Sequence, residues 1–233
     1  FARYFMVWRT RSVRPLWRDA EVRAYVVVLL VSVAAVWLLL LREGKHVDAG
    51  HALRDAAFQV VSVATTTGYA TTDYLLWPTI GPVLMLLLGA IVSCAGSTGG
   101  GIKMVRVLIL AKVTLHELVQ LIHPRVVNPV TLGGQTVPAR VIGAVIAYML
   151  VYGAVLVGLS MRMLASGLDV VTAVSAIIAC LNNIGPGMGK VGPAGNYAVL
   201  TDFQIWLCSL AMMLGRLELL SVLVLFTPQF WRR

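Results

Sequence analysis

One stretch of the chain combines hydroxyl side chains, a single glycine and an apolar setting, which suits cation coordination. Residues 64–73 read A-T-T-T-G-Y-A-T-T-D. Non-helical backbone inside a bilayer strands its carbonyl oxygens unless protein or a water-filled cavity surrounds them. In a pore, the same oxygens can replace the water shell of a cation. Gly68 has no Cβ and tolerates the dihedral angles that direct neighbouring carbonyls inward. The alternative is an ordinary turn, since Thr and Gly are common turn residues.

The composition indicates that lipid surrounds most of this chain. Of its 233 residues, 59% are hydrophobic and 12% are charged, with a mean hydropathy of +0.85, whereas soluble domains contain about 25% charged residues. The net charge of +9 does not indicate nucleic-acid binding, because the basic residues are scattered between apolar spans without an aromatic-interleaved groove. We therefore expect an all-α integral membrane protein in contact with the lipid bilayer.

Enzymatic and redox roles find no support in the residue pattern. Cys94, Cys180 and Cys208 lie in apolar segments without metal-ligand spacing, so we expect buried free thiols. The sequence contains no nucleophile and base in a catalytic arrangement, so we expect neither an enzyme nor a cofactor. The chain begins with Phe and no signal peptide precedes it, which suggests the back half of a longer protein.

The first half of the chain predicts a basic tail, a spanning helix, a half-helix and a broken helix. Residues 1–23 carry six arginines against two acidic residues, which is typical of a cytoplasmic segment. Residues 24–41 are long enough to span a bilayer, but residues 55–64 are too short and fit a re-entrant half-helix. The next apolar run, residues 80–95, ends in G-S-T-G-G-G at residues 96–101, where three consecutive glycines disfavour a helix.

The second half repeats this order. A helix at residues 102–122 completes the first half, and a turn-rich cytoplasmic linker follows at residues 123–140. We then expect a span at residues 141–164, a short apolar segment at residues 169–181, an irregular loop at residues 182–193 and a final span at residues 202–226. Most Lys and Arg residues then lie on one side, which places both ends of the chain in the cytoplasm. We expect one repeat at residues 24–122 and a second at residues 141–233.

The two repeats agree in register around their glycines. An offset of 117 residues aligns Gly68 with Gly185 and Thr66 with Asn183. A second short helix followed by a glycine loop in the same register favours a pore loop over an incidental turn. The chain is therefore predicted to contain two helix–pore-loop–helix repeats.

Four motifs together resemble the Trk/Ktr/HKT superfamily of potassium transporters, and most closely its TrkH-type membrane subunit. They are T-T-T-G-Y before Asp73, A-G-S-T-G-G-G-I-K-M-V-R, N-N-I-G-P-G-M-G and the closing G-R-L-E-L-L-S-V-L-V-L-F-T-P. In that family, four such units surround one pore with pseudo-fourfold symmetry. The resemblance implies that this chain matches the third and fourth units, which form half of such a pore.

The resemblance also implies roles for individual residues. Those matching the ion filter are Thr66, Thr67, Gly68, Tyr69, Asn183, Ile184 and Gly185, with potassium bound at all but Tyr69. Gly99, Gly100 and Gly101 match an intramembrane loop that acts as the gate, and a glycine-rich helix-packing surface is the alternative. Arg216 matches a pore-facing residue. The alternative role for Arg216 is an ion pair with Glu218. A continuous helix disfavours this pair, because residues two positions apart point to different faces.

The resemblance further implies potassium uptake across a bacterial inner membrane, a homodimer, and a cytoplasmic nucleotide-binding regulatory subunit of the TrkA type. Two other interpretations stay open. Two copies of a two-repeat chain could supply four loops around one cation pore, or the fold could serve as a non-conducting membrane scaffold.

Overall fold

The computed structural model describes residues 5, 7–9, 11–12, 19–43, 48–97, 99–124, 126, 129–225 and 227–232. Parts of the expected cytoplasmic segments, of the glycine run and of the last span lie outside these ranges, including Arg3, Arg14, Arg18, Thr98, Arg125, Asn128, Phe226 and Arg233. The described residues form helices and one short hairpin, which confirms the all-α prediction for that part of the chain.

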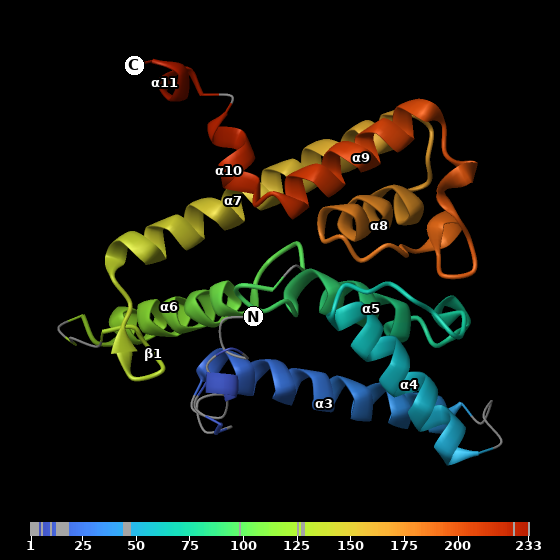
Figure 1. Cartoon of the computed structure of the whole chain (residues 1–233), viewed down its shortest axis with the longest axis horizontal. Coiled ribbons are helices and arrows are strands. Elements are labelled where there is room, and N and C mark those ends of the chain that lie inside the picture. Colours follow the sequence, from blue (N-terminus) through green and yellow to red (C-terminus); the bar gives the residue numbers. More distant parts are fainter. Residues whose placement is uncertain are drawn as a thin grey trace.

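The described part of the first unit (residues 20–122) contains four α-helices, which occupy the lower half of Figure 1. Asp19 caps the first of them by accepting a hydrogen bond of 2.8 Å from the amide of Glu21. Asp48 caps the second through the amide of Gly50, so this helix begins six residues before the predicted half-helix. The helices are α3 (Ala20–Arg42), α4 (Ala49–Ala64), α5 (Ile80–Ile91) and α6 (Met104–Ile122), with a 3-10 turn η1 (Tyr74–Leu76).

A hairpin of β1 (Thr131–Leu132) and β2 (Gln135–Thr136) connects this unit to the second one, in the upper half of Figure 1. There, α8 lies beside α7 and α9. The helices of the second unit are α7 (Ala139–Ala165), α8 (Val170–Leu181), α9 (Asp202–Arg216), α10 (Leu219–Val224) and α11 (Pro228–Trp231), with 3-10 turns η2 (Gly189–Val191) and η3 (Tyr197–Val199).

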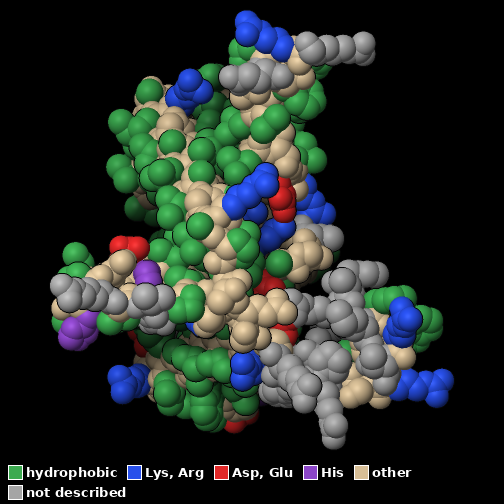
Figure 2. Space-filling model, turned by 90° about the vertical axis from the view of Figure 1, so that its left-hand side faces the viewer, with side chains coloured by type: hydrophobic (Ala, Val, Ile, Leu, Met, Phe, Trp, Pro, Cys, Tyr) green, Lys and Arg blue, Asp and Glu red, His purple; other side chains and the backbone are tan. Residues whose placement is uncertain are grey.

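Two of the described helices, α3 and α7, are long and apolar enough to cross a membrane. In each, 17% of the most apolar 18-residue window is buried, whereas a core helix of a soluble protein is mostly buried. Hydrophobic side chains cover much of the face shown in Figure 2, and charged side chains of both signs gather near its middle. This surface agrees with the expected lipid environment.

Each unit has its own apolar core, and each core receives a residue from the other unit. Ile184, which follows α8, packs in the core of the first unit beside Val63 and Leu88. Ile102, which precedes α6, packs in the core of the second unit beside Tyr148. The irregular segments, and not only the helices, therefore hold the two units together.

The final span differs from its prediction. We expected one helix over residues 202–226, but α9 ends at Arg216 and α10 begins at Leu219. Glu218 lies between them with a φ of +59°, a left-handed conformation that no α-helix contains. The prediction of a continuous helix was wrong because the Glu218 side chain is held by residues of the first unit, which local sequence does not reveal.

Candidate functional site

The loops that follow α4 and α8 have the same backbone conformation. In the first loop (residues 65–69), Thr66 and Gly68 have φ values of +54° and +78°. In the second loop (residues 182–185), Asn183 and Gly185 have φ values of +55° and +104°. Residues with side chains rarely adopt positive φ, and its cost is tolerated only where the surroundings impose it. An offset of 117 residues relates both pairs.

The same offset relates the hydrogen bonds that end the two helices. The amides of residues 65–67 donate to carbonyls four, three and five residues earlier, at 2.9, 3.0 and 2.8 Å. The amides of residues 182–184 donate in the same order, at 3.0, 3.1 and 2.9 Å. Each helix therefore turns its chain sharply at its C-terminal end, and the following residues leave the helix axis.

These turns leave a set of carbonyl oxygens available. Within the described part of the chain, no hydrogen bond reaches the carbonyl oxygens of Thr66, Thr67, Gly68, Asn183 and Ile184. The flanking carbonyls are occupied, because the hydroxyl of Ser62 donates to Tyr69 and the hydroxyl of Tyr197 donates to Gly185, at 2.6 and 2.8 Å. Available carbonyl oxygens suit a cation that has lost its water.

The two loops touch through Gly68 and Ile184. A Cβ atom on Gly68 would lie 2.1 Å from the carbonyl oxygen of Ile184, so only glycine fits there. The Ile184 side chain is in turn fixed by Gly89, on which a Cβ atom would lie 2.2 Å from its Cδ1 atom. The structure thus brings Gly68 against Ile184 and places Thr67 in the lining of one cavity with Asn183 and Gly185. That these residues form one ion site stays a prediction.

The glycine-rich loop (residues 96–101) closes on itself between α5 and α6. A parallel bridge pairs Ser93 with Lys103, and the Met104 amide donates to the carbonyl of Ser93 at 2.6 Å. Two hydroxyls hold the loop from outside: Ser93 donates to Gly100 at 3.1 Å, and Tyr148 of α7 donates to Gly101 at 2.9 Å. The described residues of this loop are therefore attached to the rest of the protein at several points.

This glycine-rich loop packs against both of the carbonyl-bearing loops. A Cβ atom on Gly99 would lie 3.2 Å from the hydroxyl oxygen of Thr66, and one on Gly100 would lie 2.8 Å from Asn183 Nδ2. One on Gly101 would lie 1.9 Å from Oδ1 of Asn182, a fully buried residue. Close approach therefore favours glycine most strongly at Gly100 and Gly101, and leaves little space at Gly99.

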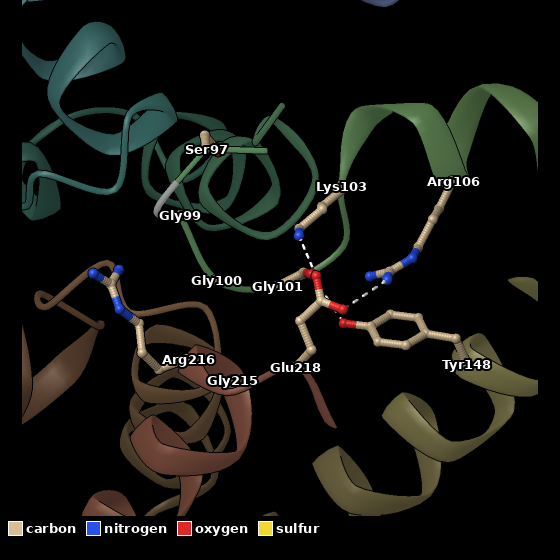
Figure 3. A pocket seen from close by; sticks show the side chains of 10 residues that line it. All are labelled: Ser97, Gly99, Gly100, Gly101, Lys103, Arg106, Tyr148, Gly215, Arg216 and Glu218. Carbon is tan, nitrogen blue, oxygen red and sulfur yellow. Dashed lines mark hydrogen bonds and ion pairs between the residues drawn. The ribbon is translucent and has the colours of Figure 1, made fainter. Parts of the chain in front are cut away.

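A cavity of about 210 Å³ lies beside the glycine-rich loop, and Figure 3 shows the residues that line it. On one side of it, Glu218 forms ion pairs with Lys103 and, at 3.8 Å, with Arg106. The Arg106 guanidinium carbon also lies 3.8 Å from the centre of the Tyr148 ring, close enough for a cation–π interaction. The lining residues are Ser97, Gly99, Gly100, Gly101, Lys103, Arg106, Tyr148, Gly215, Arg216 and Glu218.

Arg216 lines the same cavity, but its side chain points away from Glu218 (Figure 3). Glu218 instead forms its ion pairs with Lys103 and Arg106. The two side chains are therefore not arranged as the alternative ion pair between Arg216 and Glu218 would require.

Sequence reasoning missed Glu218, Lys103, Arg106 and Tyr148 as parts of this site. One signal was available: a carboxylate in a long apolar run is costly unless a basic residue pairs with it. The partners turned out to be the basic residues of A-G-S-T-G-G-G-I-K-M-V-R, which lie too far from Glu218 along the chain for the sequence to indicate the pairing.

The comparisons with known proteins agree with the motifs. The TrkH family model, described as "Cation transport protein", matches residues 3–233. The chain is 38% identical over 234 residues to the Trk system potassium uptake protein TrkH of Vibrio parahaemolyticus, covering all of this chain and 48% of that protein. It is 40% identical to the TrkH protein of Salmonella typhimurium, covering 98% of this chain and 47% of that protein.

A solved structure is similar over most of the chain. The crystal structure of the potassium transporter TrkH from Vibrio parahaemolyticus matches with a TM-score of 0.88 and 39% identity, covering 94% of this chain and 46% of that one. The chain spans about half the length of the relatives that it matches. The resemblance drawn from the motifs is confirmed: the chain belongs to the TrkH family, whose model is described as "Cation transport protein".

Proposed function

We propose that this chain forms half of a potassium uptake pore in a bacterial cell membrane. The observation that carries the proposal is the pair of touching loops in which five carbonyl oxygens accept no hydrogen bond within the described residues. Potassium requires oxygen ligands that replace its hydration shell, and backbone carbonyls supply them. The names of the relatives, which are Trk system potassium uptake proteins, support potassium as the transported ion.

The filter in this proposal consists of the two loops, each acting as one pore loop. Potassium binds at Thr66, Thr67, Gly68, Asn183, Ile184 and Gly185. Five of these carbonyls are available, and the Gly185 carbonyl is held by Tyr197 and fixes the end of its loop. Tyr69 belongs to the same filter segment, with its carbonyl held by Ser62. No bound cofactor is needed beyond the transported ion.

The gate consists of the glycine-rich loop, with Gly99, Gly100 and Gly101 at its centre, and of Arg216. The loop touches both filter loops and also lines the cavity, so its position decides whether an ion can pass between the filter and the cavity. Arg216 lines that cavity and opposes a cation electrostatically.

The remaining pore walls come from outside this chain. Two loops cannot surround an ion, and the relatives are about twice as long. We assign residues 24–122 and 141–233 to the third and fourth of four pore-loop units, joined by a cytoplasmic linker at residues 123–140, with residues 1–23 and the C-terminal end also cytoplasmic. The assembly is a homodimer of the full-length protein that binds a nucleotide-binding regulatory subunit of the TrkA type on its cytoplasmic side.

Growth of a potassium-uptake-deficient bacterial host tests this proposal. The full-length gene should restore growth at low potassium, and a Gly68→Ala variant should not, because its methyl group would collide with the Ile184 carbonyl. Gly153→Ala is the matched control, since a Cβ atom on Gly153 of α7 meets nothing within 4 Å among the residues that the structure describes. Restored growth with Gly68→Ala would refute the filter assignment, and no growth with the normal gene would favour a non-conducting scaffold.

A further inference from the structure

Two cysteines lie together behind the second loop. Cys180 comes from the last turn of α8 and Cys208 from the middle of α9, and their relative exposures are 4% and 2%. Both thiols are free, and both side chains line the same cavity. The buried free thiols expected from the sequence are thus present at these two positions, whereas Cys94 is only partly buried.

The thiol pair is linked to a carbonyl of the second loop through one tyrosine. The Cys180 thiol donates to the hydroxyl oxygen of Tyr197 at 3.8 Å, and that hydroxyl donates to the Gly185 carbonyl at 2.8 Å. A tyrosine hydroxyl has one proton to donate. Any change that turns Cys180 from a donor into an acceptor therefore competes with Gly185 for the Tyr197 proton.

A cavity of about 440 Å³ connects the thiols with the two carbonyl-bearing loops. Its lining includes Cys180, Cys208 and Tyr197 together with Thr67, Asn183 and Gly185. An ion that reaches these loops therefore has room to reach the sulfur atoms, which are the softest ligands on this path.

We infer that Cys180 and Cys208 together form a binding site for a soft divalent metal ion that takes two thiolate ligands, such as Hg(II). In the binding step, two S–H bonds break, two S–Hg bonds form and two protons leave to water, with no change in the oxidation state of sulfur. The product, Hg(S–R)₂, is neutral. A neutral product suits this site, because the surrounding cluster is apolar and an uncompensated charge there is costly.

Metal binding also alters the filter, a consequence that rests on the proposed function. Once its proton has left, Cys180 can no longer donate to Tyr197, and its metal-bound sulfur becomes an acceptor near the Tyr197 hydroxyl. The Gly185 carbonyl then loses its donor, and the end of the second loop is released. Occupation of the thiol pair therefore inhibits ion flux without blocking the pore directly.

The test uses the full-length protein in lipid vesicles, with Cys94→Ala as the background. Hg(II) is added in the presence of excess 2-mercaptoethanol, which removes metal held by a single thiol. Metal content and the ultraviolet absorption of the Hg–thiolate bond should show one equivalent more in this background than after adding Cys180→Ser or Cys208→Ser. Equal metal content in all three proteins would overturn the site. The corresponding alanine variants replace any serine variant that fails to fold.

Rubidium uptake by the same vesicles tests the link to the filter. The Cys94→Ala protein should be inhibited at an Hg(II) concentration at least about 100-fold lower than either serine variant. Tyr197→Phe should bind the metal as the background does but lose most of the additional inhibition, because the hydroxyl that connects Cys180 with Gly185 is gone. Unchanged inhibition in Tyr197→Phe would overturn the link through Tyr197. Failure of metal-free vesicles to take up rubidium would count against the proposed function alone, since metal content is measured without flux.

Discussion

The Cα atom of Gly68 lies so close to the Ile184 carbonyl that a methyl group on Gly68 would be 2.1 Å from that oxygen. This contact joins two segments 116 residues apart and sets the distance between the two loops. Since Ile184 also packs in the core of the first unit, the contact is supported by the surrounding side chains. A potassium site built on these loops therefore depends on the packing of both units.

The single glycine in each loop predicts modest ion selectivity. A T-V-G-Y-G filter has two glycines, whereas T-T-T-G-Y and N-N-I-G-P have one each, so fewer carbonyls are held toward the axis in a fixed frame. We expect the intact assembly to discriminate potassium from sodium less strongly than channels with the two-glycine filter. Relative fluxes of potassium, rubidium and sodium into vesicles measure this. Exclusion of sodium at the level of those channels would contradict the prediction.

Much of the local order in this chain could be predicted from sequence, because it depends on short-range signals. Apolar run lengths separated the long helices α3 and α7 from the short helices α4 and α8, and the positions of Gly68 and Gly185 gave the 117-residue offset. The positive φ values of Thr66 and Asn183 could not be predicted in this way. Neither residue favours that conformation, so it is imposed by tertiary packing.

The break after α9 is the clearest case in which sequence reasoning failed. The segment L-G-R-L-E-L-L favours helix by composition, and its only ionisable residues are Arg216 and Glu218. The partner that matters, Lys103, lies 115 residues earlier in the chain. Interactions over such separations cannot be inferred from local propensity, and they turn Glu218 out of the helix.

The Glu218 ion pairs predict that removing this carboxylate loosens the gate. Glu218→Gln would keep the size of the side chain but weaken the attachment to Lys103 and Arg106, which border the glycine-rich loop. We expect rubidium flux to rise up to several-fold, because the half-exposed ion pairs contribute at most about 1 kcal/mol to the cost of displacing the loop. Glu117→Gln, on the exposed side of α6, is the charge-matched control and should leave flux unchanged. A fall in flux at normal protein yield would argue against this role.

Arg216 should limit cation flux by its charge. Arg216→Gln would remove a positive charge from the lining of the cavity next to the glycine-rich loop, and cation flux should rise. Because salt screens such repulsion, the increase should be larger at low ionic strength than at high. Arg162→Gln, at the exposed end of α7, tests for a general effect of lost charge. Equal flux in Arg216→Gln and the parent at low salt would refute the electrostatic barrier.

The hydrogen bond that Asp169 accepts at the start of α8 predicts that the protein becomes less stable at acidic pH. Its carboxylate accepts a hydrogen bond of 3.0 Å from the Thr172 amide, and this bond lowers the pKa of Asp169 below its ordinary value of 3.8. A lowered pKa stabilises the folded state above the unfolded pKa, and this stabilisation is lost as the pH falls through the folded pKa. Asp169→Asn keeps a capping side chain without the titration. The melting temperature of the parent should therefore fall more than that of Asp169→Asn between pH 5 and about pH 3. Parallel curves would show that this cap makes no pH-dependent contribution.

Two glycines of the glycine-rich loop separate backbone strain from close packing. Gly96 and Gly101 have φ values of +77° and +78°, so alanine at either position incurs a similar cost of about 1–2 kcal/mol. Space differs between them: a Cβ atom on Gly96 meets no described residue within 4 Å, but one on Gly101 would lie 1.9 Å from Asn182 Oδ1. Because Asn182 directly precedes the loop residue Asn183, Gly101→Ala should displace the glycine-rich loop and change rubidium flux strongly. Gly96→Ala should lower thermal stability slightly and leave flux close to that of the parent. If both variants change flux equally, strain within the loop, and not its contact with Asn182, controls the gate.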